Sequence, residues 1–214
     1  MKKNFILFLL SVIVLISLSS CGKDATESGD VSEQKEISTA IPSEDAIGNE
    51  SAYLSVELFQ FSTKINGIVY KLPAMQTAFT TNGWSITEKS AETVKASFKA
   101  DGVLSKEETS FDIQVINPTK EDLPFEKCPI GRISYDFSGT AEIYIADSFL
   151  LNEATKTSIT EKYGEPETTE NHSDFSEITY GSRKTAGNYA KYLFRFDKSG
   201  KIIYFSIVNH YMPD

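Results

Sequence analysis

The sequence predicts an α+β fold, in which helices pack on one side of an antiparallel sheet. After Tyr53, apolar and polar residues alternate with the period of two that half-buried strands show, and turn-forming residues interrupt the alternation at short intervals. Two other segments carry helix-starting and helix-ending residues around a short apolar face. We therefore expect one or two sheets with few helices.

The clearest strand pair is predicted close to the end of the chain. Apolar residues alternate through Tyr192–Phe196 and again through Ile203–Ile207, and Asp197–Gly200 between them is typical of a turn. Both faces of this hairpin carry bulky side chains, so we expect it to be central in a sheet. Another hairpin is predicted to turn at Asn66–Gly67.

Two helices are marked by their end residues. The better-marked helix lies between Asn152 and Tyr163, where Asn152 suits the N-cap and Gly164 suits the residue after the last turn. The other helix is predicted to begin at Pro73, which suits a first helical turn, and to be closed by Asn82–Gly83. Each helix is followed by predicted strands.

This recurrence of a helix followed by strands indicates two units of similar size. We accordingly divide the chain into a signal segment (residues 1–20), a lipidated cysteine with an acidic tether (21–52) and two α+β units (53–140 and 141–214). The alternative is a chance likeness between two short helices.

The N-terminus has the layout of a secretory signal. Lys2 and Lys3 precede an apolar stretch of 14 residues, Phe5–Leu18, which is shorter than the roughly 20 residues that a membrane-spanning helix needs. Leu18–Cys21 resembles the lipobox of bacterial lipoproteins, and this resemblance implies that Cys21 receives a diacylglyceryl group and becomes the N-terminus after cleavage. The alternative is an ordinary signal peptide with a chance cysteine.

Charge is distributed unevenly along the chain. Residues 21–52 contain eight acidic residues and two lysines, whereas residues 53–214 contain 22 acidic and 17 basic residues. The first of these segments lacks aromatic residues and a sustained apolar period, so we expect a disordered tether. Because the chain is acidic and its Lys and Arg residues are scattered, we expect no nucleic-acid partner.

Residues with catalytic or metal-binding potential are few. Cys128 has no second cysteine to pair with once Cys21 is lipidated, and its apolar neighbours favour burial. His172 and His210 are the only histidines, and no metal-binding or nucleophile motif surrounds them. We therefore predict no catalytic residue, no metal and no cofactor. A pair of carboxylates acting on a sugar remains an alternative, because the fold alone sets such a pair.

Tyrosines gather near the end of the chain, and five of them lie in the last 35 residues: Tyr180, Tyr189, Tyr192, Tyr204 and Tyr211. Tyrosine is favoured at binding surfaces because it combines a large contact area with a polar tip. It is also common in strands for purely structural reasons. If the sheet is curved, its open face suits a partner, and Tyr192 and Tyr204 are the candidate partner-binding residues.

Two parts of the folded region resemble known lipoproteins. Asn66–Pro73 followed by Asn82–Trp84 looks like a pattern in small lipoproteins of Gram-positive, often gut-dwelling, bacteria. Ile159–Pro166, with the hairpin through Phe194–Phe205, is similar to the helix-then-sheet units of the β-lactamase-inhibitor-protein-like fold, which also occurs in SmpA/OmlA-type envelope lipoproteins. The resemblance implies tandem units with a curved antiparallel sheet and helices on one side. It implies no activity, because proteins of this architecture have diverse roles.

These observations lead to one functional expectation. We expect a lipoprotein on the outer side of a bacterial cytoplasmic membrane, acting as a non-catalytic binding or protein-interaction module for another envelope protein or a host protein. The alternatives are an envelope hydrolase that acts on glycans and a structural subunit of an envelope complex.

Overall fold

The computed structural model describes residues 54–181 and 189–210, which belong to one compact unit. Within these ranges no helix is long and apolar enough to cross a membrane. The strands are Ser62–Ile65 (β1), Ile68–Lys71 (β2), Ser85–Lys89 (β3), Thr93–Val94 (β4), Lys99–Lys106 (β5), Thr109–Ile116 (β6), Leu123–Pro124 (β7), Ile130–Tyr135 (β8), Ile143–Ile145 (β9), Phe149–Leu150 (β10), Thr168–Asn171 (β11), Ser176–Tyr180 (β12), Tyr189–Phe196 (β13) and Ile202–His210 (β14). The helices are Leu58–Gln60 (η1, 3-10), Thr77–Thr80 (α1), Phe125–Lys127 (η2, 3-10) and Lys156–Tyr163 (α2).

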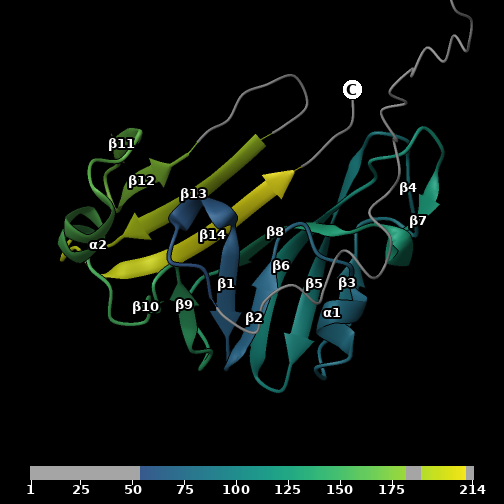
Figure 1. Ribbon diagram of the computed structural model, residues 1–214, viewed down its shortest axis with the longest axis horizontal. Coiled ribbons are helices and arrows are strands. Elements are labelled where there is room, and N and C mark those ends of the chain that lie inside the picture. The colour runs from purple at the N-terminus through teal and green to yellow at the C-terminus, as the bar shows by residue number, and fades with distance from the viewer. Residues whose placement is uncertain (1–53, 182–188, 211–214) are drawn as a thin grey trace, which may run out of the picture. The chain divides into compact units, whose positions relative to one another are not determined.

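The predicted α+β fold, with helices packed on one side of a sheet, is wrong because the described residues are mostly β-structure. An eight-stranded antiparallel sheet has the order β11-β12-β13-β14-β8-β6-β5-β3, and a four-stranded sheet has the order β10-β9-β1-β2. Figure 1 shows the small sheet in front of the large one, with α2 near one end and α1 near the other. A second sheet therefore takes the place that we expected the helices to fill.

The first predicted helix is reduced to a single turn by tertiary pairing. Ala74, which we expected inside the helix, exchanges backbone hydrogen bonds of 3.0 and 2.7 Å with Ile130 and is therefore extended. The Gln76 side chain then donates to the carbonyl oxygens of Phe125 and Cys128, at 2.6 and 3.0 Å. Helical backbone begins only at Thr77.

The second predicted helix exists and ends where expected, at Tyr163 with Gly164 as its C-cap. Its N-cap is Thr155, which forms a capping box with Ser158, and not Asn152. The Asn152 side chain instead bonds the backbone of residues 141 and 143, next to β9. A side chain that suits an N-cap can thus bond the backbone of another element instead.

Strands from both expected units share each sheet. Residues 53–140 contribute β3, β5, β6 and β8 to the large sheet, and residues 141–214 contribute β11 to β14. The two groups meet where β8 pairs with β14, with Phe205 opposite Tyr135 and Val208 opposite Arg132. In the small sheet, the β1–β2 pair and the β9–β10 pair meet in the same way, where β1 pairs with β9.

The core lies between the two sheets and is rich in aromatic rings. Phe61, beside β1, stacks on Tyr192 of β13 with ring centroids 5.5 Å apart, and the Tyr192 hydroxyl donates to the Ser62 carbonyl oxygen at 3.3 Å. The Tyr192 ring is also stacked with Phe194 and Phe205 at 6.3 Å each. This cluster joins the sheets at the centre of the unit.

Both predicted hairpins are confirmed. β13 and β14 pair around the turn Asp197–Gly200, and β1 and β2 pair around Asn66–Gly67. Because side chains alternate along a strand, the register of β13 decides which residues enter the core. Tyr192 and Phe194 face the small sheet, whereas Leu193 and Arg195 face away from it.

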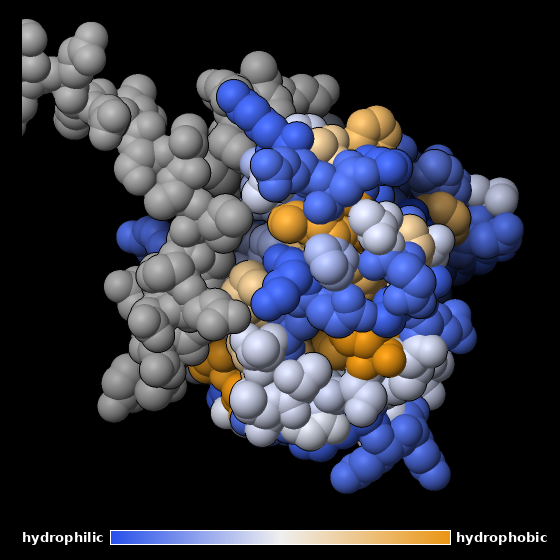
Figure 2. Space-filling model, turned by 90° about the vertical axis from the view of Figure 1, so that its right-hand side faces the viewer, coloured by the Kyte–Doolittle hydropathy of each residue, from blue (hydrophilic) through white to orange (hydrophobic). Residues whose placement is uncertain are grey.

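The end of the unit that carries β3, β4 and β7 has a mainly hydrophilic surface, on which apolar side chains form only small separate patches (Figure 2). Phe98, between β4 and β5, is 66% exposed. Asn117 holds the adjacent loop through bonds from its amide to the carbonyl oxygens of Val94 and Glu121, at 2.9 and 2.7 Å. The long connection after β6 is thus ordered by a buried side-chain amide.

The contact between the sheets predicts that alanine substitutions at two phenylalanines lower the stability of the protein by very different amounts. Replacing buried Phe61 with Ala should lower the free energy of unfolding by about 3 kcal/mol, because it removes a ring from the centre of the core. The same change at exposed Phe98 should cost less than about 0.5 kcal/mol. Urea unfolding followed through the fluorescence of Trp84, the single tryptophan, measures both changes. Equal losses would contradict the proposed role of Phe61.

Candidate functional site

The outer face of the large sheet, which points away from the small sheet, collects the charged side chains of its strands. Opposite residues on neighbouring strands lie on the same face, so the register defines two rows of outward side chains. One row contains Asp101, Gln114, Arg132, Val208 and Lys191, and the other contains Glu170, Glu177, Arg195 and Tyr204. We consider this face the candidate functional site.

The two candidate tyrosines lie on opposite faces of the sheet. Tyr192 is fully buried in the core, so its assignment as a partner-binding residue is wrong. Tyr204 is half-buried on the outer face, opposite Arg195. The two positions differ because Tyr192 pairs with the inward Ile207, whereas Tyr204 and Arg195 belong to the outward set.

Arg195 holds an aromatic cluster together on the outer face. Its guanidinium carbon lies 4.7 Å from the Tyr204 ring centroid and 5.2 Å from the Phe175 ring centroid. Its Nε donates to Glu177 Oε2 at 2.7 Å, and the Arg195 side chain keeps 39% of its surface exposed. His172 stacks on Phe175, with ring centroids 4.3 Å apart. The cluster thus offers two rings and a cation whose orientation a carboxylate fixes.

Between the two charged rows, strands β12, β13, β14 and β8 carry a line of small or apolar buried side chains, which ends at the exposed Asp112 on β6. Ser134 and Ser206 face each other across β8 and β14, and the Ser134 hydroxyl donates to Ser206 Oγ at 2.9 Å. Both serines, together with Thr179 and Leu193, are less than 9% exposed. Long side chains therefore stand on either side of a low strip in the middle of the face.

At the other end of the outer face a buried histidine bonds a lysine and lies near an arginine. His210 is 4% exposed, and Lys99 Nζ donates to its Nδ1 at 2.8 Å. A bulge at Gly131 leaves room for the ring, because a Cβ on Gly131 would lie 2.6 Å from the imidazole Cδ2. Arg132, next along β8, donates to Asp101 Oδ1 at 2.9 Å.

Burial, together with the neighbouring positive charges, keeps the His210 ring neutral. Burial lowers the pKa of His210 to about 3, and the positive charges of Lys99 and Arg132 act in the same direction. The pKa of Lys99 is itself lowered, first by burial and then by the charge of Arg132. A neutral imidazole can accept the hydrogen bond from the ammonium group, which a protonated ring could not do.

The remaining perturbed groups have structural explanations. Cys128 is buried as expected, and burial raises the pKa of its thiol to about 11. The carboxyl pKa values that shift among the described residues are all lowered by hydrogen bonds, at Asp122, Glu126, Asp136 and Asp197. The described residues contain no group of three or more His, Cys, Asp or Glu side chains arranged to hold a metal.

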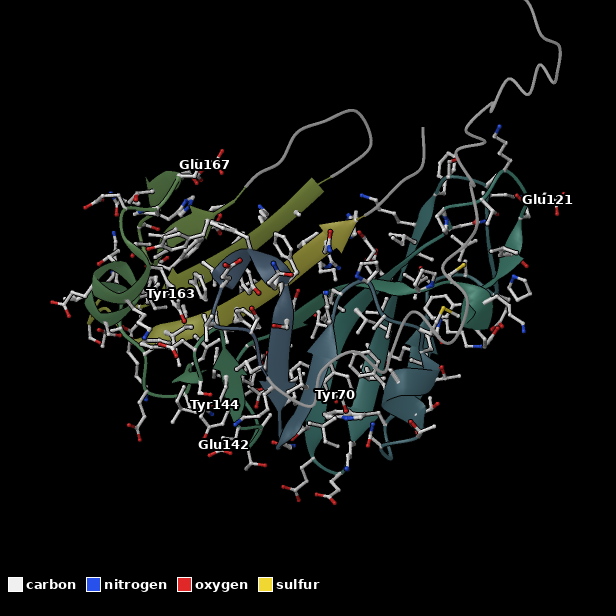
Figure 3. All side chains as sticks on the ribbon, viewed as in Figure 1. Tyr70, Glu121, Glu142, Tyr144, Tyr163 and Glu167 are labelled. Atoms are coloured by element: carbon white, nitrogen blue, oxygen red, sulfur yellow. The ribbon has the colours of Figure 1, made fainter. Side chains whose placement is uncertain are left out.

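Several tyrosines pack in the core and bond backbone groups through their hydroxyls. The hydroxyls of Tyr163 and Tyr180 donate to the carbonyl oxygens of Ala146 and Gly164, at 2.7 and 2.8 Å. Burial raises the pKa of both phenols, that of Tyr180 to about 12. Figure 3 shows that Tyr163, Tyr144 and Tyr70 lie on separate elements and do not converge on one point.

The outer face of the small sheet carries a second pairing of a cation with a tyrosine. Lys64 Nζ lies 4.0 Å from the Tyr144 ring centroid. A hydrogen bond to Glu142 raises the pKa of the Tyr144 phenol. This pair is chemically similar to Arg195 and Tyr204 but lies on the opposite side of the core, so it provides a matched comparison.

Some residues named in the sequence prediction lie outside the described ranges. Some residues of the outer face were not predicted from the sequence. Cys21 and Tyr211 are outside the described residues, and so is the side chain of Tyr189. Arg195 was missed, although its alternation with Tyr192 and Phe194 places it on the face opposite to theirs. The contact of Lys99 with His210 had no such signal, because 111 positions separate the two residues.

Comparison of the chain with known protein families, curated proteins and solved structures found no match.

The lowered pKa of His210 predicts a specific dependence of stability on pH. Below about pH 6.5 the unfolded chain protonates this residue while the folded chain does not, so acidification favours unfolding until about pH 3. Protonation of this one group should change the free energy of unfolding by at most about 1.4 kcal/mol per pH unit. His210→Gln keeps an acceptor for Lys99 but cannot titrate in this range.

Urea unfolding of both proteins at pH 6.5 and pH 5 measures the effect. The wild type should lose about 1.6 kcal/mol more than the variant between these two pH values. An identical loss would show that His210 binds its proton equally in the folded and unfolded states. Circular dichroism at pH 7 verifies that the variant is folded.

Proposed function

We propose that this chain is a membrane-anchored, non-catalytic binding module, and that it contacts another protein through the outer face of its large sheet. The observation that carries this proposal is the cluster of Phe175, Arg195 and Tyr204. Tyrosine and arginine are enriched among the residues that dominate protein interfaces. Here Glu177 and the two rings hold the arginine in place, so less side-chain freedom is lost when a partner binds.

The line of buried serines supports the same use of this face. Small side chains in the middle, with long charged ones on either side, leave a strip that a convex partner can approach closely. Outward residues of both signs, such as Arg132 and Glu177, allow charge complementarity to select the partner. An envelope protein or a host protein is the partner class that a surface-displayed module would meet.

The anchor is part of the proposal and rests on the N-terminal sequence. A diacylglyceryl group on Cys21 would hold the chain stably, because two acyl chains bind a bilayer much more tightly than one does. Residues 22–52 would then separate the folded unit from the lipid surface. The outer face would remain accessible above the membrane.

Cross-linking in intact producing cells tests the proposed surface. A protein captured recurrently by the wild type should be captured at least tenfold less by Arg195→Ala/Tyr204→Ala, because alanine removes the central side chains of the cluster. Lys64→Ala/Tyr144→Ala is the matched control, since it removes a similar pair from the opposite side of the core. If both double variants capture the partner as the wild type does, the outer face of the large sheet is not the contact surface.

Metabolic labelling with palmitate tests the anchor. Cys21→Ser should abolish the label, because the lipid is attached to that sulfur. Cys128→Ser should keep the full label per molecule of protein, since this buried thiol has no part in the attachment. A label that survives the change at Cys21, or that disappears with Cys128, would disprove lipidation at Cys21.

A further inference from the structure

Strand β11, at one edge of the large sheet, has an open side. It pairs with β12 along its whole length, from Thr168 opposite Thr179 to Asn171 opposite Ser176, with no break in register. Within the part of the chain that the structure describes, no strand pairs with its other side. All four residues of β11 are exposed, and Figure 1 shows the strand at the end of the sheet, near α2. An open edge of this kind can accept a further strand.

The hydrogen bonds to β12 show which backbone groups face the open side. The His172 N–H donates to the Phe175 carbonyl oxygen at 2.9 Å, directly after β11, so these two residues form a hydrogen-bonded pair. Along antiparallel strands such pairs alternate with pairs that are not hydrogen-bonded. Glu170 therefore bonds β12, whereas the N–H and C=O groups of Thr169 and Asn171 point away from β12. These groups are the ones that an added strand would bond.

The opposite edge of the large sheet, β3, is protected against strand addition. A bulge between Ile86 and Glu88 breaks its register, and Lys89 at its end bonds Glu92 and Glu126. Bulges and lysines are two means by which proteins keep other strands from an edge. β11 has no bulge, no lysine and no proline. Of the two edges of this sheet, β11 is therefore the one that suits an added strand.

The side chain of Glu170 determines the charge that such a strand should carry. Glu170 lies on the outer face opposite Glu177 and is 61% exposed. Arg195 bonds Glu177, whereas the nearest basic group to Glu170 is His172 Nε2, at 3.6 Å. Opposite charges that face each other on neighbouring strands stabilise the pairing, and like charges destabilise it. A lysine or arginine opposite Glu170 is therefore favoured.

The same carboxylate disfavours a second copy of this chain as the added strand. Two antiparallel β11 strands use the open groups of both residues only when Thr169 of each copy lies opposite Asn171 of the other. In that register the two copies of Glu170 face each other on the outer face. Their like charges repel, whereas a basic segment of a different protein meets no such repulsion.

We propose that the open edge of β11 binds an extended, basic segment of another protein as an added strand, with a lysine or arginine of that segment opposite Glu170. Thr169 and Asn171 provide the backbone hydrogen bonds, and Glu170 selects the charge. This edge is separate from the cluster of Phe175, Arg195 and Tyr204. The inference does not rest on the proposed function, and its test uses other residues.

Hydrogen exchange in the free protein tests whether the edge is open. The full chain, labelled with a nitrogen isotope, is studied by nuclear magnetic resonance in a nonionic detergent at pH 6.5. The amide hydrogens of Thr169 and Asn171 should exchange with water faster than that of Glu170, which bonds β12. Slow exchange at both positions would overturn the proposal, because the edge would then be occupied already.

The binding probe is the peptide acetyl-Thr-Lys-Thr-Lys-Thr-amide. It should shift the amide signals of Thr169 and Asn171, with a midpoint on the order of 0.1–1 mM for so short a strand. A peptide with glutamate in place of lysine should bind at least about fivefold more weakly. A basic peptide with methylated threonine nitrogens keeps the charge but lacks the donors that face β11, so it should not bind. No saturable shift with the basic peptide, or equal binding of either control peptide, would overturn the proposal.

Variants assign the binding to this edge. Glu170→Lys should weaken binding of the basic peptide at least about fivefold and strengthen binding of the acidic one. Glu88→Lys, the same change at an exposed position of β3, should leave both midpoints unchanged. Thr169→Pro removes an open N–H group and should weaken binding, whereas Thr169→Ala keeps that group and should not. Wild-type binding by Glu170→Lys would overturn the proposal, and this variant keeps the test valid if Thr169→Pro does not fold.

Dilution of the free protein tests a second copy as the occupant. The signals of Thr169 and Asn171 should be the same at all protein concentrations. A shift that grows with concentration, and that Glu170→Gln strengthens, would show that the edge pairs with another copy of this chain. That result would overturn the assignment of the edge to a different protein.

Discussion

The packing of the small sheet against the large one around Tyr192 is the interaction on which the rest of the structure depends. The Tyr192 ring stacks on Phe61 from the other sheet, and its hydroxyl bonds the Ser62 carbonyl oxygen. The bond satisfies two polar groups that burial would otherwise leave unpaired at a cost of about 1–3 kcal/mol each. Because this contact requires Tyr192 to face inward, it also requires every second residue of β13 to face outward. The register of β13 therefore determines both which of its residues enter the core and which lie on the outer face.

The same register explains how an acidic chain presents ordered cations. Arg195 is outward because Phe194 and Phe196 are inward, and it then finds Glu177 and Tyr204 on the adjacent strands. Lys99 reaches His210 where Gly131, at the bulge, leaves room for the imidazole ring. In both places a glutamate or a histidine restricts a long, flexible side chain. Restricting such side chains before binding reduces the entropy lost on association.

Sequence reasoning predicted the elements that depend on local residues. It located the hairpin after Tyr192, the end of the helix at Gly164 and the burial of Cys128. It failed where a distant segment competes for a residue. Ala74 pairs with Ile130 instead of joining the predicted helix, and both residues are buried. It also did not predict that β1, β2, β9 and β10 form a separate sheet, since β1 and β9 pair across 80 positions of sequence.

The sequence by itself determined which residues alternate, where the chain turns and which signal precedes Cys21, because these properties depend on near neighbours in the chain. It also made Tyr192 and Tyr204 belong to opposite alternation sets without indicating which set would be buried. Only the tertiary structure decided that, because either face of a strand can become the core until a second layer packs on one of them. The meeting of Lys99 with His210 was decided in the same way, since it results from strand order and a bulge.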